Sequence, residues 1–234
     1  MRDKHTWITW LFEAKKSYGL SVLNYMVTSN HVHLIVSDNG HRETIPRSIQ
    51  LVARRVGQDY NQRKKCKAVF WEEHYHAPAV KSGEHLVQCL IYSDLTMVCA
   101  GVVEHSSEGP FCGYHETQNP RLRYSLIDYQ RLIPLLHMKD REDLQASCKN
   151  RADEAIVAID QSRDSTCKES IAVGNERFIE ATKRLLGVKG KGRKIIGSEK
   201  SYELREPTAS YGGNFTPENG HISLQNTYFW ADYH

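Results

Sequence analysis

Two histidines one residue apart, His31 and His33, open a short apolar run. Successive side chains of a strand point to opposite faces, so the two imidazoles share one face and the valine and leucine side chains take the other, toward a core. Two neighbouring imidazoles can hold a divalent metal ion with little ordering cost. The chain has 12 histidines in 234 residues and a second such pair, His74 and His76, so the spacing can also arise by chance.

The elements that would position these histidines follow from hydrophobic periodicity and from turn residues. Predicted helices cover 5–17, 44–63 and 82–97, and predicted strands cover 20–28, 31–37, 68–71 and 75–80. Further along the chain, Asp140 and Asn175 are predicted to cap two more helices.

Basic residues gather on and just after the helix predicted over 44–63. Against one acid, Asp59, the segment contains seven basic side chains: Arg47, Arg54, Arg55, Arg63, Lys64, Lys65 and Lys67. Such a cluster is typical of a solvated helix face or of a surface that binds a phosphate backbone, and the residues alone leave both interpretations open.

Tyr92 lies on the polar half of the helix predicted over 82–97, near His85, Gln88 and Thr96. The apolar half carries a stripe of leucine, isoleucine and valine. A tyrosine on the polar half either caps the edge between helix and sheet or serves a function. Its position on the helix alone does not decide between these two interpretations.

Composition narrows the class of protein. With 40% hydrophobic and 25% charged residues, the chain is expected to be a soluble globular protein of one or two domains. The net charge is only +3, so binding to nucleic acid must depend on local clusters. The six cysteines include no C-x-x-C pair, which argues against a zinc ribbon and favours reduced thiols in a cytoplasm. No apolar run reaches 18 residues, so we expect no membrane span.

The order of these pieces resembles the single-tyrosine HUH transposases of the insertion-sequence-200-like class, in particular the REP-associated tyrosine transposases. The run 25–36 resembles their HUH strand, and the similarity continues through the stretches 50–53, 58–64, 70–72, 75–77, 89–95, 172–174 and 202–207. Each stretch is short, but together they span most of the chain.

The resemblance implies an α+β fold. It predicts a ferredoxin-like antiparallel sheet with helices on one face over residues 1–118. A mainly helical C-terminal extension with an irregular tail is expected over 119–234.

The resemblance also implies an activity, the cleavage and rejoining of single-stranded DNA at hairpins through a 5′-phosphotyrosine. By this likeness His31 and His33 match the ligands of Mg²⁺ or Mn²⁺, and Tyr92 matches the nucleophile. Two imidazoles suit the softer manganese ion better. The expected partner is a single-stranded DNA hairpin, gripped by Arg47, Arg54, Arg55, Arg63, Lys64 and Lys65. The protein is expected to be a cytoplasmic monomer or homodimer.

The chain departs from this family at four points. Thr96 stands where relatives carry an asparagine one helical turn after the tyrosine, and it is a possible member of the metal shell. Cys99 and His74 each replace an arginine. Relatives also have a strand before the first helix, which begins here almost at Met1, so we expect one sheet edge to lack its partner.

Two other functions compete with strand transfer. A catalytically impaired descendant would bind DNA hairpins and act as a binder or repressor. A metal-dependent hydrolase would need a carboxylate beside His31 and His33, and no acidic residue lies near them on the strand.

Overall fold

The computed structural model describes residues 2–29, 31–67, 69–71, 75–121, 123–158, 170–186, 192–197 and 201–205. His74 and the predicted tail from residue 206 onward lie outside these ranges.

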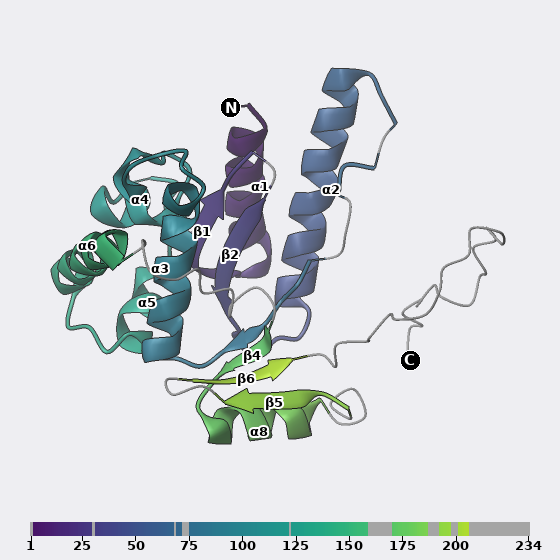
Figure 1. Ribbon diagram of the computed structural model, residues 1–234. Coiled ribbons are helices and arrows are strands. Elements are labelled where there is room, and N and C mark those ends of the chain that lie inside the picture. The colour runs from purple at the N-terminus through teal and green to yellow at the C-terminus, as the bar shows by residue number, and fades with distance from the viewer. Residues whose placement is uncertain are drawn as a thin grey trace, which may run out of the picture.

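The described residues form a mixed α+β protein with two small sheets (Figure 1). The helices are α1 (Arg2–Tyr18), α2 (Thr44–Lys64), α3 (Glu84–Cys99), η1 (Ser106–Glu108), α4 (Gly113–Gln118), α5 (Tyr129–Leu135), α6 (Arg141–Ala158) and α8 (Glu176–Leu185). The strands are β1 (Ser21–Val27), β2 (Val32–Ser37), β3 (Ala79–Val80), β4 (Ser170–Gly174), β5 (Lys194–Gly197) and β6 (Tyr202–Arg205). One sheet is the antiparallel hairpin β1–β2, and the other has the order β3-β4-β6-β5.

The predicted helices and the first two strands are confirmed, and so are both caps. The side chain of Asp140 accepts a hydrogen bond from the backbone N–H of Asp143, and that of Asn175 accepts one from Phe178. Where the structure describes the predicted strands 68–71 and 75–80, that prediction is wrong except at Ala79 and Val80, which pair in parallel with β4. That pairing joins segments far apart in the chain, so no local sequence pattern could predict it.

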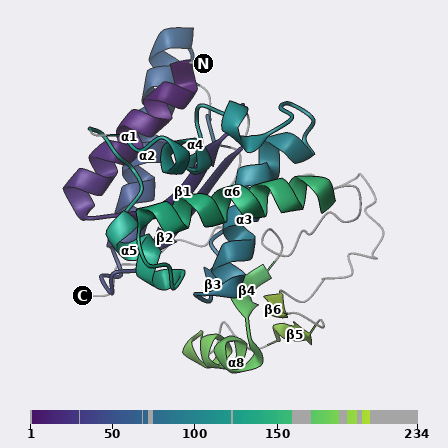
Figure 2. The ribbon, with the colours of Figure 1, turned by 90° about the vertical axis from the view of Figure 1, so that its left-hand side faces the viewer.

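Helices cover both faces of the β1–β2 sheet (Figure 2). The buried stripe of α1, which is Trp7, Leu11 and Ala14, shares the main core with β1 and with the inner side of α2. On the opposite face, Asn24 of β1 donates a hydrogen bond to Asp94 of α3. Every residue of β1 is buried, as a strand covered on both faces requires. The expectation of helices on a single face is therefore wrong for this sheet.

The outer edge of β1, expected to lack its partner, is covered by two irregular segments. The carbonyl of Val22 accepts a hydrogen bond from the N–H of Asp128, and the N–H of Val27 donates to the carbonyl of Phe111. Isolated bridges join β1 to Ile127 and to Cys112. These contacts satisfy backbone groups that a neighbouring strand would otherwise pair.

A buried carboxylate on α4 holds one of these segments in place. Oε1 of Glu116 accepts hydrogen bonds from the N–H groups of Leu126 and Ile127, and Oε2 accepts one from the hydroxyl of Tyr25. Burial, reinforced by Glu116, raises the pKa of Tyr25 well above its usual value. The hydroxyl therefore stays protonated and remains a donor to this carboxylate.

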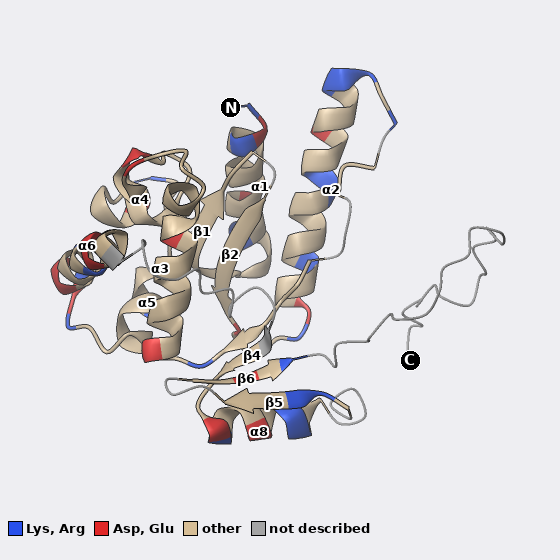
Figure 3. Cartoon of the chain, in the orientation of Figure 1, with Lys and Arg blue, Asp and Glu red and all other residues tan. Residues whose placement is uncertain are grey.

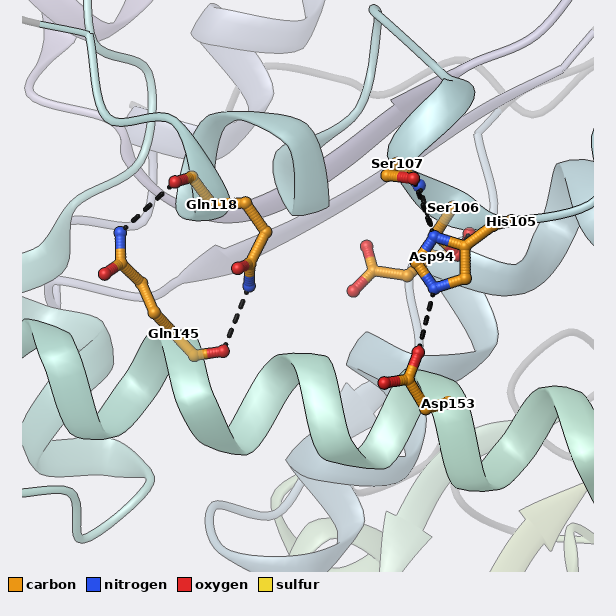
Figure 4. A network of polar contacts seen from close by, with 7 residues as sticks. All are labelled: Asp94, His105, Ser106, Ser107, Gln118, Gln145 and Asp153. Carbon is orange, nitrogen blue, oxygen red and sulfur yellow. Dashed lines mark hydrogen bonds and ion pairs between the residues drawn. The ribbon is translucent and has the colours of Figure 1, made fainter.

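The part of the chain after residue 119 packs directly on the part before it. Gln118 of α4 and Gln145 of α6 exchange side-chain to backbone hydrogen bonds, and His105 pairs with Asp153 at 3.1 Å (Figure 4). Helices α5 and α6 form the first part of this region, and the described residues from 170 onward add helix α8 and the strands β4, β5 and β6, which the sequence analysis did not predict. Within the described ranges, no helix has the length and apolar character needed to cross a membrane.

Candidate functional site

His33 of β2 and Tyr92 of α3 are in ring contact. Their centroids lie 5.9 Å apart and the ring planes meet at 87°, an edge-to-face arrangement. His33 pairs with Met26 across the hairpin, and directly paired residues point to the same face of a sheet. This is the face on which α3 packs, so the fold brings one of the predicted metal ligands against the predicted nucleophile.

A buried polar contact fixes α3 on the sheet two residues after Tyr92. Nδ2 of Asn24 donates to Oδ1 of Asp94 at 2.8 Å, and the hydroxyl of Ser106 donates to the Asp94 carbonyl at 2.8 Å. A Cβ atom at Gly113 would lie 1.8 Å from Oδ1 of Asn24, so only glycine permits this close approach of α4 to β1. The position of Tyr92 thus depends on a contact between β1, α3 and η1.

Asp94 is a functional candidate that the sequence analysis missed. Burial raises the pKa of Asp94 to about 7, although hydrogen bonds from Asn24 and from the Tyr114 backbone oppose the rise. The signal was present in the sequence, because this carboxylate interrupts the apolar half of α3 between Leu90 and Leu95. Figure 4 shows Asp94 beside Ser106.

His31 lies in the turn between β1 and β2, immediately before the strand. Its backbone N–H donates to Oγ1 of Thr28 at 2.9 Å, and its carbonyl accepts hydrogen bonds from the Thr28 N–H and hydroxyl. The His31 side chain is exposed, whereas that of His33 is half-buried. The turn therefore holds the backbone of His31 firmly and leaves its imidazole at the surface.

The predicted ligands for a metal ion are the imidazoles of His31 and His33. Within the part of the chain that the structure describes, no three His, Cys, Asp or Glu side chains gather around a point that could hold a metal ion. Two imidazoles with water or phosphate oxygens in the remaining positions fit a weakly held divalent ion such as Mn²⁺. A hydrolase site would need a carboxylate ligand at the same place.

Thr96 lies one helical turn beyond Tyr92 and is half-buried. Its hydroxyl donates a hydrogen bond to the carbonyl of Tyr92 at 3.1 Å, as threonine commonly does inside a helix. The hydroxyl proton is thus engaged within α3. The structure gives Thr96 a bond to the backbone of the candidate nucleophile, and its expected role in a metal shell stays a prediction.

The basic residues predicted to bind DNA separate into two groups, although all lie on α2 or directly after it, where Figure 3 shows Lys and Arg in blue. The guanidinium of Arg55 lies 4.8 Å from the centre of the Trp10 ring, and Arg63 forms an ion pair with Asp3, so both are held against α1. Arg47 pairs with Glu43, the residue just before its own helix.

The second group consists of Arg54, Lys64 and Lys65. Arg54 and Lys65 line an open groove of about 660 Å³ between α2 and the described residues that follow it, 66, 67 and 69–71. Lys64 is exposed at the end of α2.

Comparisons with models of protein families, with curated proteins and with solved structures found no match for this chain.

Proposed function

We propose that this protein cleaves and rejoins single-stranded DNA, with Tyr92 as the nucleophile. The observation that carries the proposal is the ring contact between Tyr92 and His33. The sequence resemblance assigns these two residues to one active site, and they come from different elements of the fold. We also propose that α1, β1, β2 and α2, which follow one another in this order along the chain, form part of a ferredoxin-like fold.

The proposed reaction follows from the chemistry of a phenol. The Tyr92 oxygen attacks the phosphorus of a phosphodiester, a tyrosine O–P bond forms and the bond from phosphorus to the 3′-oxygen breaks. The phenol releases its proton and the departing 3′-oxygen takes one up. A later 3′-hydroxyl can reverse the step without ATP, because the covalent intermediate keeps the energy of the original bond.

His31 and His33 are the residues that would hold a divalent ion in this site. Such an ion, when bound, polarises the phosphate and stabilises the charge that develops on its oxygens. The contribution of the chain itself is orientation. The contact with the His33 ring limits where the Tyr92 ring can turn, and the contact between Asn24 and Asp94 fixes the helix that carries Tyr92.

One observation favours a second candidate, a DNA-hairpin binder with impaired chemistry. Among the described residues, no group of three His, Cys, Asp or Glu side chains could hold a metal ion, and the Thr96 hydroxyl already bonds to its own helix. Such a protein would bind hairpins without forming a covalent product.

The test is adduct formation by the full chain with a pool of single-stranded hairpins that have randomised stems and flanks, in buffer containing MnCl₂. Each hairpin carries one label at its 5′ end and a different one at its 3′ end, and the products are separated on a denaturing gel. We expect the 3′ label to stay on the protein and the 5′ label to be released, because a 5′-phosphotyrosine retains the downstream fragment. Binding without any adduct would favour the second candidate, and an adduct that carries the 5′ label would contradict the proposed chemistry.

A further inference from the structure

The groove beside α2 is built from three kinds of side chain. One wall is the second half of α2, and the other is the chain that leaves it, where Trp71 returns to donate from Nε1 to the carbonyl of Ala53 at 3.0 Å. Phe70 supports this wall by packing on both Tyr60 and Trp71, with ring centroids 4.8 and 4.9 Å away. Aromatic packing and one hydrogen bond therefore hold this wall of the groove, whose volume is about 660 Å³, against α2.

The floor of the groove includes Gly57, in the middle of α2. A glycine inside a helix costs about 1 kcal/mol relative to alanine. A Cβ at residue 57 would lie 3.5 Å from the Cβ of Phe70, so Phe70 packs closely on α2 at this point and supports the wall that carries Trp71.

The chemistry of the lining suits an unpaired nucleotide. Trp71 is partly exposed at 37%, so its ring can stack on a base, an interaction that every base can make. Gln58 and Gln62 supply amide groups that can bond to base edges. Arg54 and Lys65 add positive charge for the phosphates, and the structure records no ion pair for either among the residues it describes.

The groove lies at the same end of the molecule as the His31 turn. α1 begins there, because Asp3 pairs with Arg63 near the end of α2. Phe111 packs on His5 of α1 and bonds through its carbonyl to Val27, the last residue of β1 before the turn. The C-terminal end of α2, the start of α1 and the β1–β2 turn are therefore neighbours, as Figure 1 also shows.

We propose that this groove binds unpaired DNA, with one base stacked on Trp71 and its phosphates on Arg54 and Lys65. The identification of the ligand as DNA rests on the proposed function. The groove would then hold the single-stranded flank of a hairpin and give the protein affinity for unpaired nucleotides that does not depend on the Tyr92 chemistry.

The experiment measures binding by fluorescence anisotropy, using full-length Tyr92→Phe protein and a fluorescein-labelled poly-dT strand of about 12 nucleotides. We expect Trp71→Ala to weaken binding roughly 5- to 150-fold, the usual effect of removing one stacking ring. Trp71→Phe should restore most of the affinity because it keeps a ring. The matched control is Tyr124→Ala, which removes an aromatic side chain that is 69% exposed and lies outside the groove.

Equal affinities for the Trp71→Ala variant and its parent would overturn the inference, as would tighter binding of a poly-U RNA of the same length. Circular dichroism and a thermal melt of each variant establish that the fold is retained. The experiments distinguish a failure of the groove proposal from a failure of the strand-transfer proposal. Binding that depends on Trp71 with no covalent adduct in the hairpin assay would leave the groove standing and remove strand transfer, whereas adducts with Trp71-independent binding would do the reverse.

Discussion

The edge-to-face contact between His33 and Tyr92, with ring centroids 5.9 Å apart, joins the hairpin β1–β2 to helix α3 at the candidate site. It depends on α3 packing on the sheet face that also carries Asn24. The consequences can be tested one residue at a time.

Tyr92→Phe should abolish covalent adducts and leave hairpin affinity within about twofold, because it removes one hydroxyl and adds no volume. The measurement is adduct yield on a denaturing gel beside an anisotropy titration. Tyr124→Phe is the control, since its ring is largely exposed and lies outside the site. Adducts that persist in Tyr92→Phe, or a peptide map that places the DNA on another tyrosine, would refute the assignment.

His31→Ala and His33→Ala should each remove metal-dependent cleavage. Each should also cost less stability than the roughly 2–5 kcal/mol typical of a large core truncation, since neither side chain is fully buried. Single-turnover cleavage and chemical denaturation measure the two effects. His41→Ala, at an exposed position in the loop before α2, is the matched control. Undiminished cleavage by the parent protein in EDTA would contradict the metal role.

Thr96→Asn should raise the cleavage rate, more at low Mn²⁺ than at saturation. An asparagine offers an amide oxygen one heavy atom further out, whereas the threonine hydroxyl bonds to the Tyr92 carbonyl. Loss of a group that supports a metal ligand typically costs 10–100-fold, which sets the scale of the gain. The measurement is single-turnover cleavage across a manganese titration.

Thr96→Val is the control, because it removes the bond to Tyr92 without adding a ligand. Overlapping titration curves for the parent and Thr96→Asn would exclude Thr96 from the metal shell.

The two groups of basic residues should respond differently to mutation. Arg54→Ala with Lys65→Ala should lower the salt dependence of single-strand binding by a slope of about 1.4, from about 0.7 for each phosphate contact. Arg55→Ala with Arg63→Ala should leave the slope nearly unchanged and reduce stability, by about 1–2 kcal/mol at most, because these side chains contact α1. Equal slopes for the two double variants would mean that the separation has no bearing on DNA.

Asp94→Asn should change how stability depends on pH. Because the pKa of Asp94 is raised to about 7 in the folded protein, that state binds more protons than the unfolded chain between about pH 4 and pH 7. The stability contributed by Asp94 is therefore fully present below about pH 4 and is lost progressively as the pH rises from about 4 to about 7. Within this interval, each unit of rising pH should lower the unfolding free energy of the parent, relative to that of Asp94→Asn, by about 1.4 kcal/mol.

Urea unfolding of both proteins at several pH values measures this difference. The variant keeps an oxygen that can accept the Asn24 hydrogen bond, so a pH-independent difference would show that Asp94 is ionised in both states.

The sequence by itself determined the elements that form from local interactions. The helical stripe of α1 and the caps at Asp140 and Asn175 were all predictable, because periodicity and capping act over a few residues. The same holds for the Thr96 bond to the Tyr92 carbonyl, which lies within one helical turn.

Only the tertiary structure decided which distant residues meet. It placed His33 against Tyr92, turned Arg55 and Arg63 toward α1, and paired β3 with β4. It also closed the outer edge of β1 with segments that contain no strand. Such contacts join parts of the chain that carry no local signal for one another. They form because buried backbone groups must be paired and apolar faces covered, and that requirement is met by whichever segment the packing brings close.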